Sequence, residues 1–171
     1  MALVQYPIAK TGDYLCIYEK SLTISNTAYS AGDNIGELME ISNATAGADE
    51  NGTIEQIEIL EVVASGQSAQ KASIQFYFQK TTFASGDDNA AFSLTAPGTD
   101  TDVIGIAGTV ATADYVDVAG ASTDYTIVRK AVSVPFKNST DTTLYGRLIS
   151  SGTPQYGSGS KVIARVYIKR H

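Results

Sequence analysis

The chain has 171 residues, of which 43% are hydrophobic and 18% are charged, and its formal net charge at pH 7 is −6. A chain of this size and composition buries a core without help from disulfides or metals, so we expect a single domain over residues 1–171. The negative net charge argues against nucleic acid as a direct partner, because contact with phosphates needs a basic surface.

The cysteine content and the N-terminal sequence predict folding in a reducing cytoplasm. The only cysteine, Cys16, lies between apolar neighbours, which predicts a small core residue, and a single cysteine excludes an internal disulfide. The sequence MALVQYPIAK lacks the basic and apolar regions of a signal peptide. No apolar run approaches the ~18 residues of a membrane span, so we expect no membrane contact.

Short runs rich in β-branched and aromatic residues recur along the chain, and clusters of Gly, Asn, Asp and Ser separate them. The predicted strands are Val4–Ala9, Tyr14–Glu19, Ser21–Ser25, Ile35–Ile41, Ile54–Val63, Ala72–Lys80, Ala91–Thr95, Val103–Val110, Tyr115–Val118, Tyr125–Phe136, Thr143–Ile149 and Lys161–Lys169. Helical spacing is weak throughout, and the best helix candidate, Ile35–Ile41, is short and contains Gly36. The pattern predicts an all-β fold, an antiparallel sandwich or barrel, with Ser150–Ser160 as an exposed loop.

Alternation within the strands predicts which side chains face the core. The predicted core faces are Ala72, Ile74, Phe76 and Phe78; Val128, Val132, Val134 and Phe136; and Val162, Ala164, Val166 and Ile168. The predicted water face of Ala72–Lys80 includes Tyr77 and Gln79. The strand Ile54–Val63 has apolar residues on both sides, with Ile57 and Ile59 on one face and Ile54 on the other.

The residues needed for common catalytic sites are missing. The only histidine is His171, the last residue, so a Ser-His-Asp or Cys-His arrangement has no firmly held base. One cysteine and one histidine are too few for the usual zinc sites. Acidic residues are interpreted as solvated strand positions (Glu55, Glu58 and Glu61) or as turn residues (Asp87, Asp88, Asp100 and Asp102). We therefore predict no enzymatic activity and no catalytic, cofactor-binding or metal-binding residues.

Two binding hypotheses stand beside that prediction. The segments Gly86–Asn89 and Asp100–Asp102 offer hard oxygen ligands to calcium, but their spacing fits no EF-hand and turn closure explains them better. Exposed tyrosines form sugar-binding platforms in some β-sandwiches, and the candidates are Tyr77, Tyr125, Tyr145, Tyr156 and Tyr167. Packing at half-buried strand positions is the preferred explanation for these tyrosines.

Several short segments, spread over most of the chain, form a further pattern. They are Tyr29–Gly36, Gly52–Ile54, Phe76–Phe78, Asp88–Phe92, Leu144–Ile149 and Gly152–Tyr156. This pattern resembles the head decoration, or auxiliary capsid, proteins of tailed bacteriophages; Lys169 and Arg170 lie outside it. The resemblance implies a jelly-roll-like β-sandwich, often trimeric, that sits on the outside of an icosahedral shell and stabilises it against the pressure of internal DNA.

We therefore expect an all-β, antiparallel, jelly-roll-like sandwich that serves as a non-enzymatic capsid decoration or cement protein. It would be made in the host cytoplasm and carried on the capsid exterior. Its expected partners are the major capsid protein and copies of itself, as a homotrimer, with no nucleic acid and no membrane. The alternatives are a glycan-binding module of a virion and another head-fibre or tail component.

Overall fold

The computed structural model describes residues 4–7, 14–94, 102–118, 124–138 and 141–171. The strands are β1 (Val4–Pro7), β2 (Tyr14–Leu22), β3 (Asn34–Ile41), β4 (Asn51–Val63), β5 (Ile74–Gln79), β6 (Val103–Val110), β7 (Val116–Val118), β8 (Asp124–Lys137), β9 (Leu144–Ser150) and β10 (Lys161–Arg170). A short 3-10 helix, η2 (Thr112–Asp114), lies between β6 and β7.

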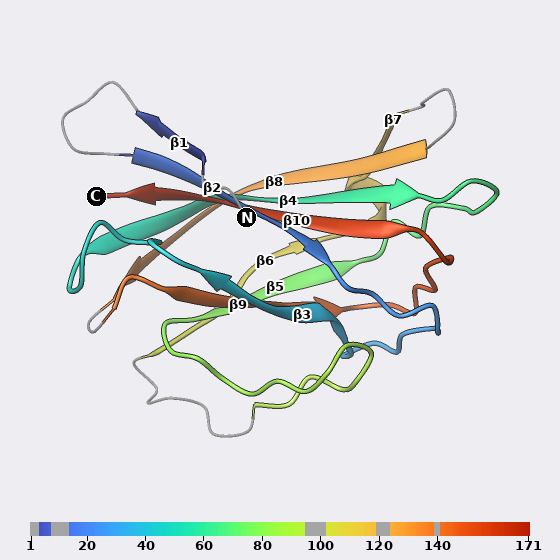
Figure 1. The fold of residues 1–171 in the computed structure, drawn as a ribbon, viewed down its shortest axis with the longest axis horizontal. Coiled ribbons are helices and arrows are strands. Elements are labelled where there is room, and N and C mark those ends of the chain that lie inside the picture. The colour runs from blue at the N-terminus through green and yellow to red at the C-terminus, as the bar shows by residue number, and fades with distance from the viewer. Residues whose placement is uncertain (1–3, 8–13, 95–101, 119–123, 139–140) are drawn as a thin grey trace.

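The strands form two layers (Figure 1). The larger sheet has six strands in the order β1-β2-β10-β4-β8-β7, and the smaller sheet has four in the order β3-β9-β5-β6. Every pair is antiparallel, which confirms the predicted all-β antiparallel sandwich. Residues 35–41 lie in β3, so the strand prediction there was right and the weak helix candidate was not.

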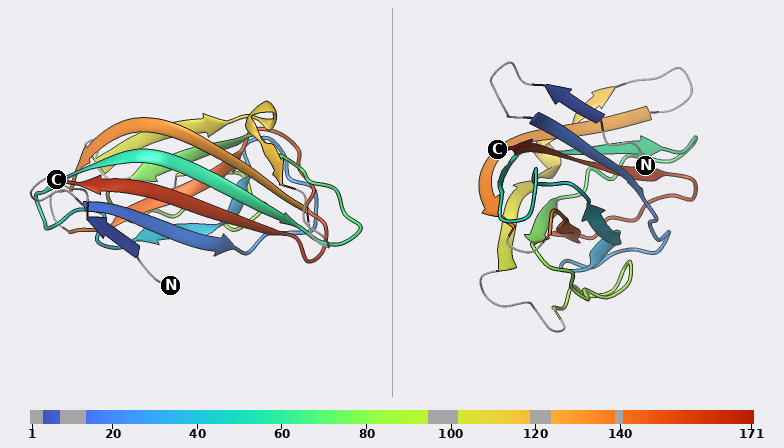
Figure 2. Two further views of the ribbon diagram at one scale, coloured as in Figure 1. Left: turned by 90° about the horizontal axis from the view of Figure 1, so that it is seen from above. Right: turned by 60° about the vertical axis from the view of Figure 1, so that its left-hand side comes forward.

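The pairing of the strands is nested. When β1 and β7 are left out, the first strand of the chain, β2, pairs with the last strand, β10. Moving inward along the chain, β3 pairs with β9, β4 with β8, and β5 with β6. A long hairpin that folds over on itself has this order. Segments far apart in the sequence consequently lie side by side, as the two further views in Figure 2 also show.

The main core lies between the two sheets, and its predicted faces are largely confirmed. All four predicted core residues are buried in Ala72–Phe78, and all four are buried in Val162–Ile168. In β8, Val128 and Phe136 are buried and Val132 and Val134 pack partly buried against the same cluster. Cys16 is buried too, as predicted, and burial raises the pKa of its thiol.

Two predictions about the strand faces were wrong. Tyr77 and Gln79 are buried instead of facing water, because the segment after β5 folds back over the smaller sheet and brings Phe83 and Phe92 against Tyr77. Ile54 shares the core face with Ile57 and Ile59, because the β4 register with both neighbours shifts between residues 54 and 56. Such a bulge resets the alternation, which a strict period of two cannot anticipate.

Two predicted segments also differ from the structure. The expected strand Ala91–Thr95 contains only an isolated bridge from Ala91 to Asp33, and Thr95 lies outside the described residues. The expected exposed loop Ser150–Ser160 is anchored, because Pro154 and Tyr156 are buried. Tyr156 packs edge-on against Tyr29 with a ring-centroid distance of 5.8 Å, so this loop closes one part of the core.

Candidate functional site

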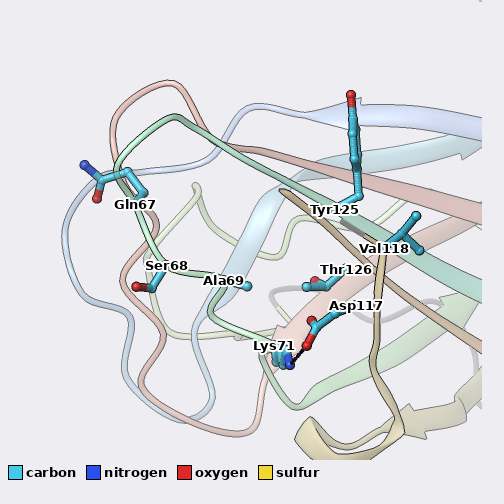
Figure 3. Close-up of a pocket in the computed structure, with 8 residues that line it drawn as sticks. All are labelled: Gln67, Ser68, Ala69, Lys71, Asp117, Val118, Tyr125 and Thr126. Atoms are coloured by element: carbon cyan, nitrogen blue, oxygen red, sulfur yellow. Dashed lines mark hydrogen bonds and ion pairs between the residues drawn. The ribbon is translucent and has the colours of Figure 1, made fainter. Parts of the chain in front are cut away.

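An open groove lies where β7 and the start of β8 meet the loop that follows β4 (Figure 3). Its volume is about 410 Å³, and its lining residues are Gln67, Ser68, Ala69, Lys71, Asp117, Val118, Tyr125 and Thr126. The ammonium group of Lys71 lies 2.8 Å from the carboxylate of Asp117 and ties the loop to β7. The groove is thus lined by both polar and apolar side chains, and one ion pair lies within it.

Glu61 fixes the loop that borders this groove. Its buried carboxylate accepts hydrogen bonds from the backbone N–H groups of Gln70, at 2.8 Å, and Lys71, at 3.0 Å. The hydroxyl of Thr126 on β8 donates to the same carboxylate at 3.4 Å. Glu61 was predicted to be a solvated strand residue, which is wrong, and its role here is structural.

The predicted sugar platform is not assembled by the tyrosines. Tyr77 and Tyr156 are buried, while Tyr145 and Tyr167 are partly buried at strand positions. Tyr125 is exposed at the groove, but Figure 3 shows its ring directed away from Lys71 and Asp117. An aromatic face stacked above polar groups, the arrangement that suits a sugar, is therefore not formed by Tyr125 and this ion pair.

The outer face of the larger sheet carries a set of apolar side chains in register. They come from four neighbouring strands: Val116 and Val118 of β7, Tyr125 and Ile127 of β8, Leu60 and Val62 of β4, and Ile163 of β10. Each is exposed or partly exposed, and Val116 and Val118 are the most open, at 62% and 50%. We call this set the outer apolar patch. Large exposed apolar patches occur at sites that bind proteins, membranes or ligands.

A row of alternating charges borders the outer apolar patch. Cross-strand pairing aligns Arg129 of β8, Glu58 of β4, Arg165 of β10 and Glu19 of β2. Arg129 Nε lies 2.6 Å from Glu58 Oε2, and Arg165 binds both Glu58 and Glu19. Glu58 has no exposed surface, so the prediction that it is solvated was wrong. We call these four residues the charged row.

A second apolar surface lies on the opposite side of the sandwich. Val103 and Ile106 of the edge strand β6 are 38% and 47% exposed. They pair across the sheet with Gln79 and Tyr77, which face outward from the smaller sheet under the covering segment. The molecule therefore presents apolar side chains on both of its outer faces.

The acidic segment proposed as a calcium site forms a hydrogen-bonded turn. Asp88 accepts a hydrogen bond from the Tyr29 hydroxyl at 2.8 Å and another from the Gly36 N–H at 2.6 Å. Asp87 is exposed, Asp102 is partly exposed, and Asp100 lies outside the described residues. Within the described ranges, no group of three or more Asp, Glu, His or Cys side chains gathers as metal ligands.

The same turn network joins the segments Tyr29–Gly36, Asp88–Phe92 and Leu144–Ile149. The Asn34 N–H donates to the Ala90 carbonyl and the Phe92 N–H to the Gly32 carbonyl, each at 2.8 Å. Arg147 of β9, itself buried, donates to the Gly86 carbonyl at 2.8 Å. Burial lowers the pKa of the Arg147 guanidinium, and the nearby acidic side chains act in the opposite direction. The network holds the segment that covers the smaller sheet in one position.

The C-terminal residues are anchored in the fold. The His171 N–H donates to the Asn51 carbonyl at 3.1 Å, and its ring Nε2 lies 3.0 Å from the Thr53 hydroxyl. The sequence predicted that a terminal histidine lacks a fixed orientation, whereas these contacts hold it beside the start of β4.

A scan against protein-family models found no family that matches this chain, and a search of curated proteins found no matching relative. In the part of the chain that the structure describes, no helix has the length and apolar character needed to cross a membrane. The function is therefore inferred from the fold, from its two apolar surfaces and from the resemblance.

Proposed function

We propose that this chain is a non-enzymatic structural protein of a virion, a decoration or cement protein that binds the outside of a phage head. Its partners are the major capsid protein and copies of itself, arranged as a homotrimer as the resemblance implies. The sandwich is a jelly roll in this proposal, and the nested pairing of its eight inner strands supports that assignment.

The observation that carries the proposal is the pair of apolar surfaces on opposite faces of the sandwich. A decoration protein must contact the shell and also its own neighbours, so it needs more than one protein-binding surface. The outer apolar patch and the β6 surface of Val103 and Ile106 supply two. The main core lies between the sheets and does not use either surface, so both remain available for partners.

Binding to heads that lack this chain tests the proposal. Purified protein is mixed with such heads and sedimented, and the bound fraction is measured for the wild type and for Ile106→Lys. We expect saturable binding of the wild type. The absence of sedimentation with heads, at concentrations where the protein is folded, would contradict the proposal.

A glycan-binding module is the alternative, and the groove beside β7 is the feature that favours it. Its exposed Gln67 and Asp117 offer hydrogen-bonding groups, and Tyr125 lies at its edge. A glycan array probed with the wild type and with Tyr125→Ala decides between the two functions. Reproducible sugar binding that is lost in the variant would favour the alternative, and its absence would favour decoration.

A further inference from the structure

We propose that residues 81–94, which follow β5, form a cover that opens as a unit while the two sheets stay folded. We call these residues the cover segment. In Figure 1 it lies against the smaller sheet, on the side away from the larger sheet. The open state presents a face of the smaller sheet that the closed state hides. This inference goes beyond the proposed function, and it does not depend on binding to a capsid.

The path of the chain lets the cover segment move without disturbing a strand. The backbone leaves the smaller sheet at Lys80 and is beside it again at Asp102, because the Lys80 N–H donates to the Asp102 carbonyl at 2.8 Å. The pairing of β5 with β6 is therefore closed at the base of this excursion. Neither of the described sheets takes a strand from the cover segment. Its opening consequently leaves both sheets as they are.

The apolar side chains beneath the cover segment form a cluster of their own. Phe83 and Phe92 pack against Tyr77 with ring-centroid distances of 5.4 and 5.1 Å, and Ile149 is buried in the same cluster. This cluster is separate from the main core, which lies between the two sheets. Lifting the cover segment therefore uncovers Tyr77 and Ile149 and leaves the main core intact.

Polar groups beneath the cover segment reduce the free-energy cost of opening it. The side chains of Asn34, Gln79 and Arg147 are almost fully buried there. The guanidinium of Arg147 donates to the Gly86 carbonyl at 2.8 Å, while its Nε atom and Asn34 Oδ1 have no protein partner among the described residues. Burying charged and polar groups costs free energy that contact with bulk water returns. Opening this mixed surface is therefore less costly than opening an apolar core of equal area.

Hydrogen bonds that gather around one residue, Asn34, hold the cover segment closed. The Asn34 N–H donates to the Ala90 carbonyl at 2.8 Å, and the Asn89 N–H donates to the Asn34 carbonyl at 2.9 Å. Asp88 accepts a hydrogen bond from the nearby Gly36 N–H at 2.6 Å. Contacts that share one attachment point break together, so we expect opening to be cooperative.

Amide hydrogen exchange, resolved by residue with NMR, tests the opening. The N–H groups of Asn34, Asn89 and Phe92 bond between the cover segment and the turn before β3. They should share one protection factor, at least about 100-fold lower than that of the paired N–H groups of β4 and β10, which need global unfolding to exchange. Equal protection of the two sets, or unequal protection within the first set, would overturn the proposal.

A substitution in the main core separates local opening from global unfolding. Ile59→Val, on β4, should speed exchange of the β4 and β10 amides at least about 3-fold, because the main core loses a buried methyl group. The amides of Asn89 and Phe92 should change by less than about 2-fold, because the main core stays folded when the cover segment opens. Equal acceleration of both sets of amides would overturn the proposal.

A disulfide should lock the cover segment closed. Asp33 and Ala91 form an antiparallel bridge in which their chain neighbours make the hydrogen bonds, so their Cα atoms lie about 4.5 Å apart, a separation that suits a disulfide. The variant is Asp33→Cys with Ala91→Cys in a Cys16→Ala background, and its reduced form is the matched control. Oxidation should narrow the difference in protection between Phe92 and β4 at least about 10-fold. A difference that oxidation leaves unchanged would overturn the proposal.

These experiments use the isolated protein, so their outcome does not depend on phage heads. Amides of the cover segment that exchange only by global unfolding would overturn the opening and leave the decoration function as it stands. Protein that opens as expected but does not bind heads would support the opening and contradict the proposed function. The two proposals therefore fail separately.

Discussion

Glu58 and Arg129 are joined at 2.6 Å across the β4–β8 pair, although Glu58 is fully covered and the Arg129 side chain is 61% exposed. Arg165 binds the same carboxylate from β10, and the Tyr167 hydroxyl lies 3.2 Å from it. One carboxylate thus holds three strands of the larger sheet together. The hydrogen bond to Glu58, together with the negative charge of that carboxylate, raises the pKa of Arg129.

Replacing this carboxylate should destabilise the protein. We expect Glu58→Gln to lower the free energy of unfolding by about 1–3 kcal/mol, because two guanidinium groups lose their shared charged partner. Glu55→Gln on the same strand, at the bulge, is the control and should change it by less than about 0.5 kcal/mol. Urea unfolding measures both, and equal effects of the two substitutions would contradict the role given to Glu58.

Asp88 should be needed to hold the segment that covers the smaller sheet. Asp88→Ala removes the acceptor for the Tyr29 hydroxyl and the Gly36 N–H, which we expect to cost about 1–3 kcal/mol. Asp87→Ala at the exposed neighbouring position is the matched control and should be close to neutral. Limited proteolysis should cut between residues 80 and 94 faster in Asp88→Ala only. Cutting at the same rate in both variants would argue against this network.

Gly146 lies where the sheets leave no room for a side chain. A Cβ atom at this position would lie 2.7 Å from a ring carbon of Phe78 and 2.9 Å from the Met39 methyl group. We expect Gly146→Ala to destabilise the protein by about 1–3 kcal/mol through overpacking. At Gly152 an added Cβ meets nothing within 4 Å, so Gly152→Ala should be tolerated. Thermal unfolding compares the two, and an unchanged melting temperature in Gly146→Ala would contradict the packing described.

The buried tyrosines should make the protein sensitive to alkali. Burial, followed by the charges of Glu37 and Glu40, raises the pKa of Tyr18 to about 12 from an ordinary value of about 10. The folded state therefore holds this proton more tightly than the unfolded state. Its contribution to stability is complete below pH 10 and is lost as the pH rises from about 10 to about 12.

Tyr18→Phe should accordingly reduce the loss of stability between pH 9 and pH 11.5, measured by urea unfolding at each pH. Burial also raises the pKa of Tyr29, Tyr115 and Tyr156, so part of the loss should remain. Tyr125→Phe on the exposed outer face controls for removal of a hydroxyl group. An identical alkaline loss in the wild type and in Tyr18→Phe would show that Tyr18 ionises equally easily in both states.

The strand pattern was largely predictable because alternation is a local property. The apolar face of β10 from Val162 to Ile168 could be identified from the sequence, and so could that of β5. The failures have non-local causes. Glu58 looked solvated because the arginines that cover it come from the distant strands β8 and β10. Glu61 looked solvated because the backbone groups that cover it come from the loop after β4. Tyr77 looked exposed because its cover lies beyond the end of its own strand.

The candidate surfaces were harder to predict. Val116 and Val118 form a very short strand, and nothing local shows that they align with Leu60 and Ile163. That alignment depends on the register of three strand pairs, which the sequence does not state. The charged row is hidden for the same reason, since its four members are spread from residue 19 to residue 165.

Imaging of phage heads is the most direct test of the proposed role. Heads assembled without this chain, and the same heads after the purified protein has been added back, are compared by negative-stain microscopy and three-dimensional averaging. We expect added density at regular positions on the outer surface of the shell. We also expect the heads that carry the added protein to resist heating better than the heads that lack it. Density confined to the tail, or heads that look the same with and without the protein, would contradict a role in capsid decoration.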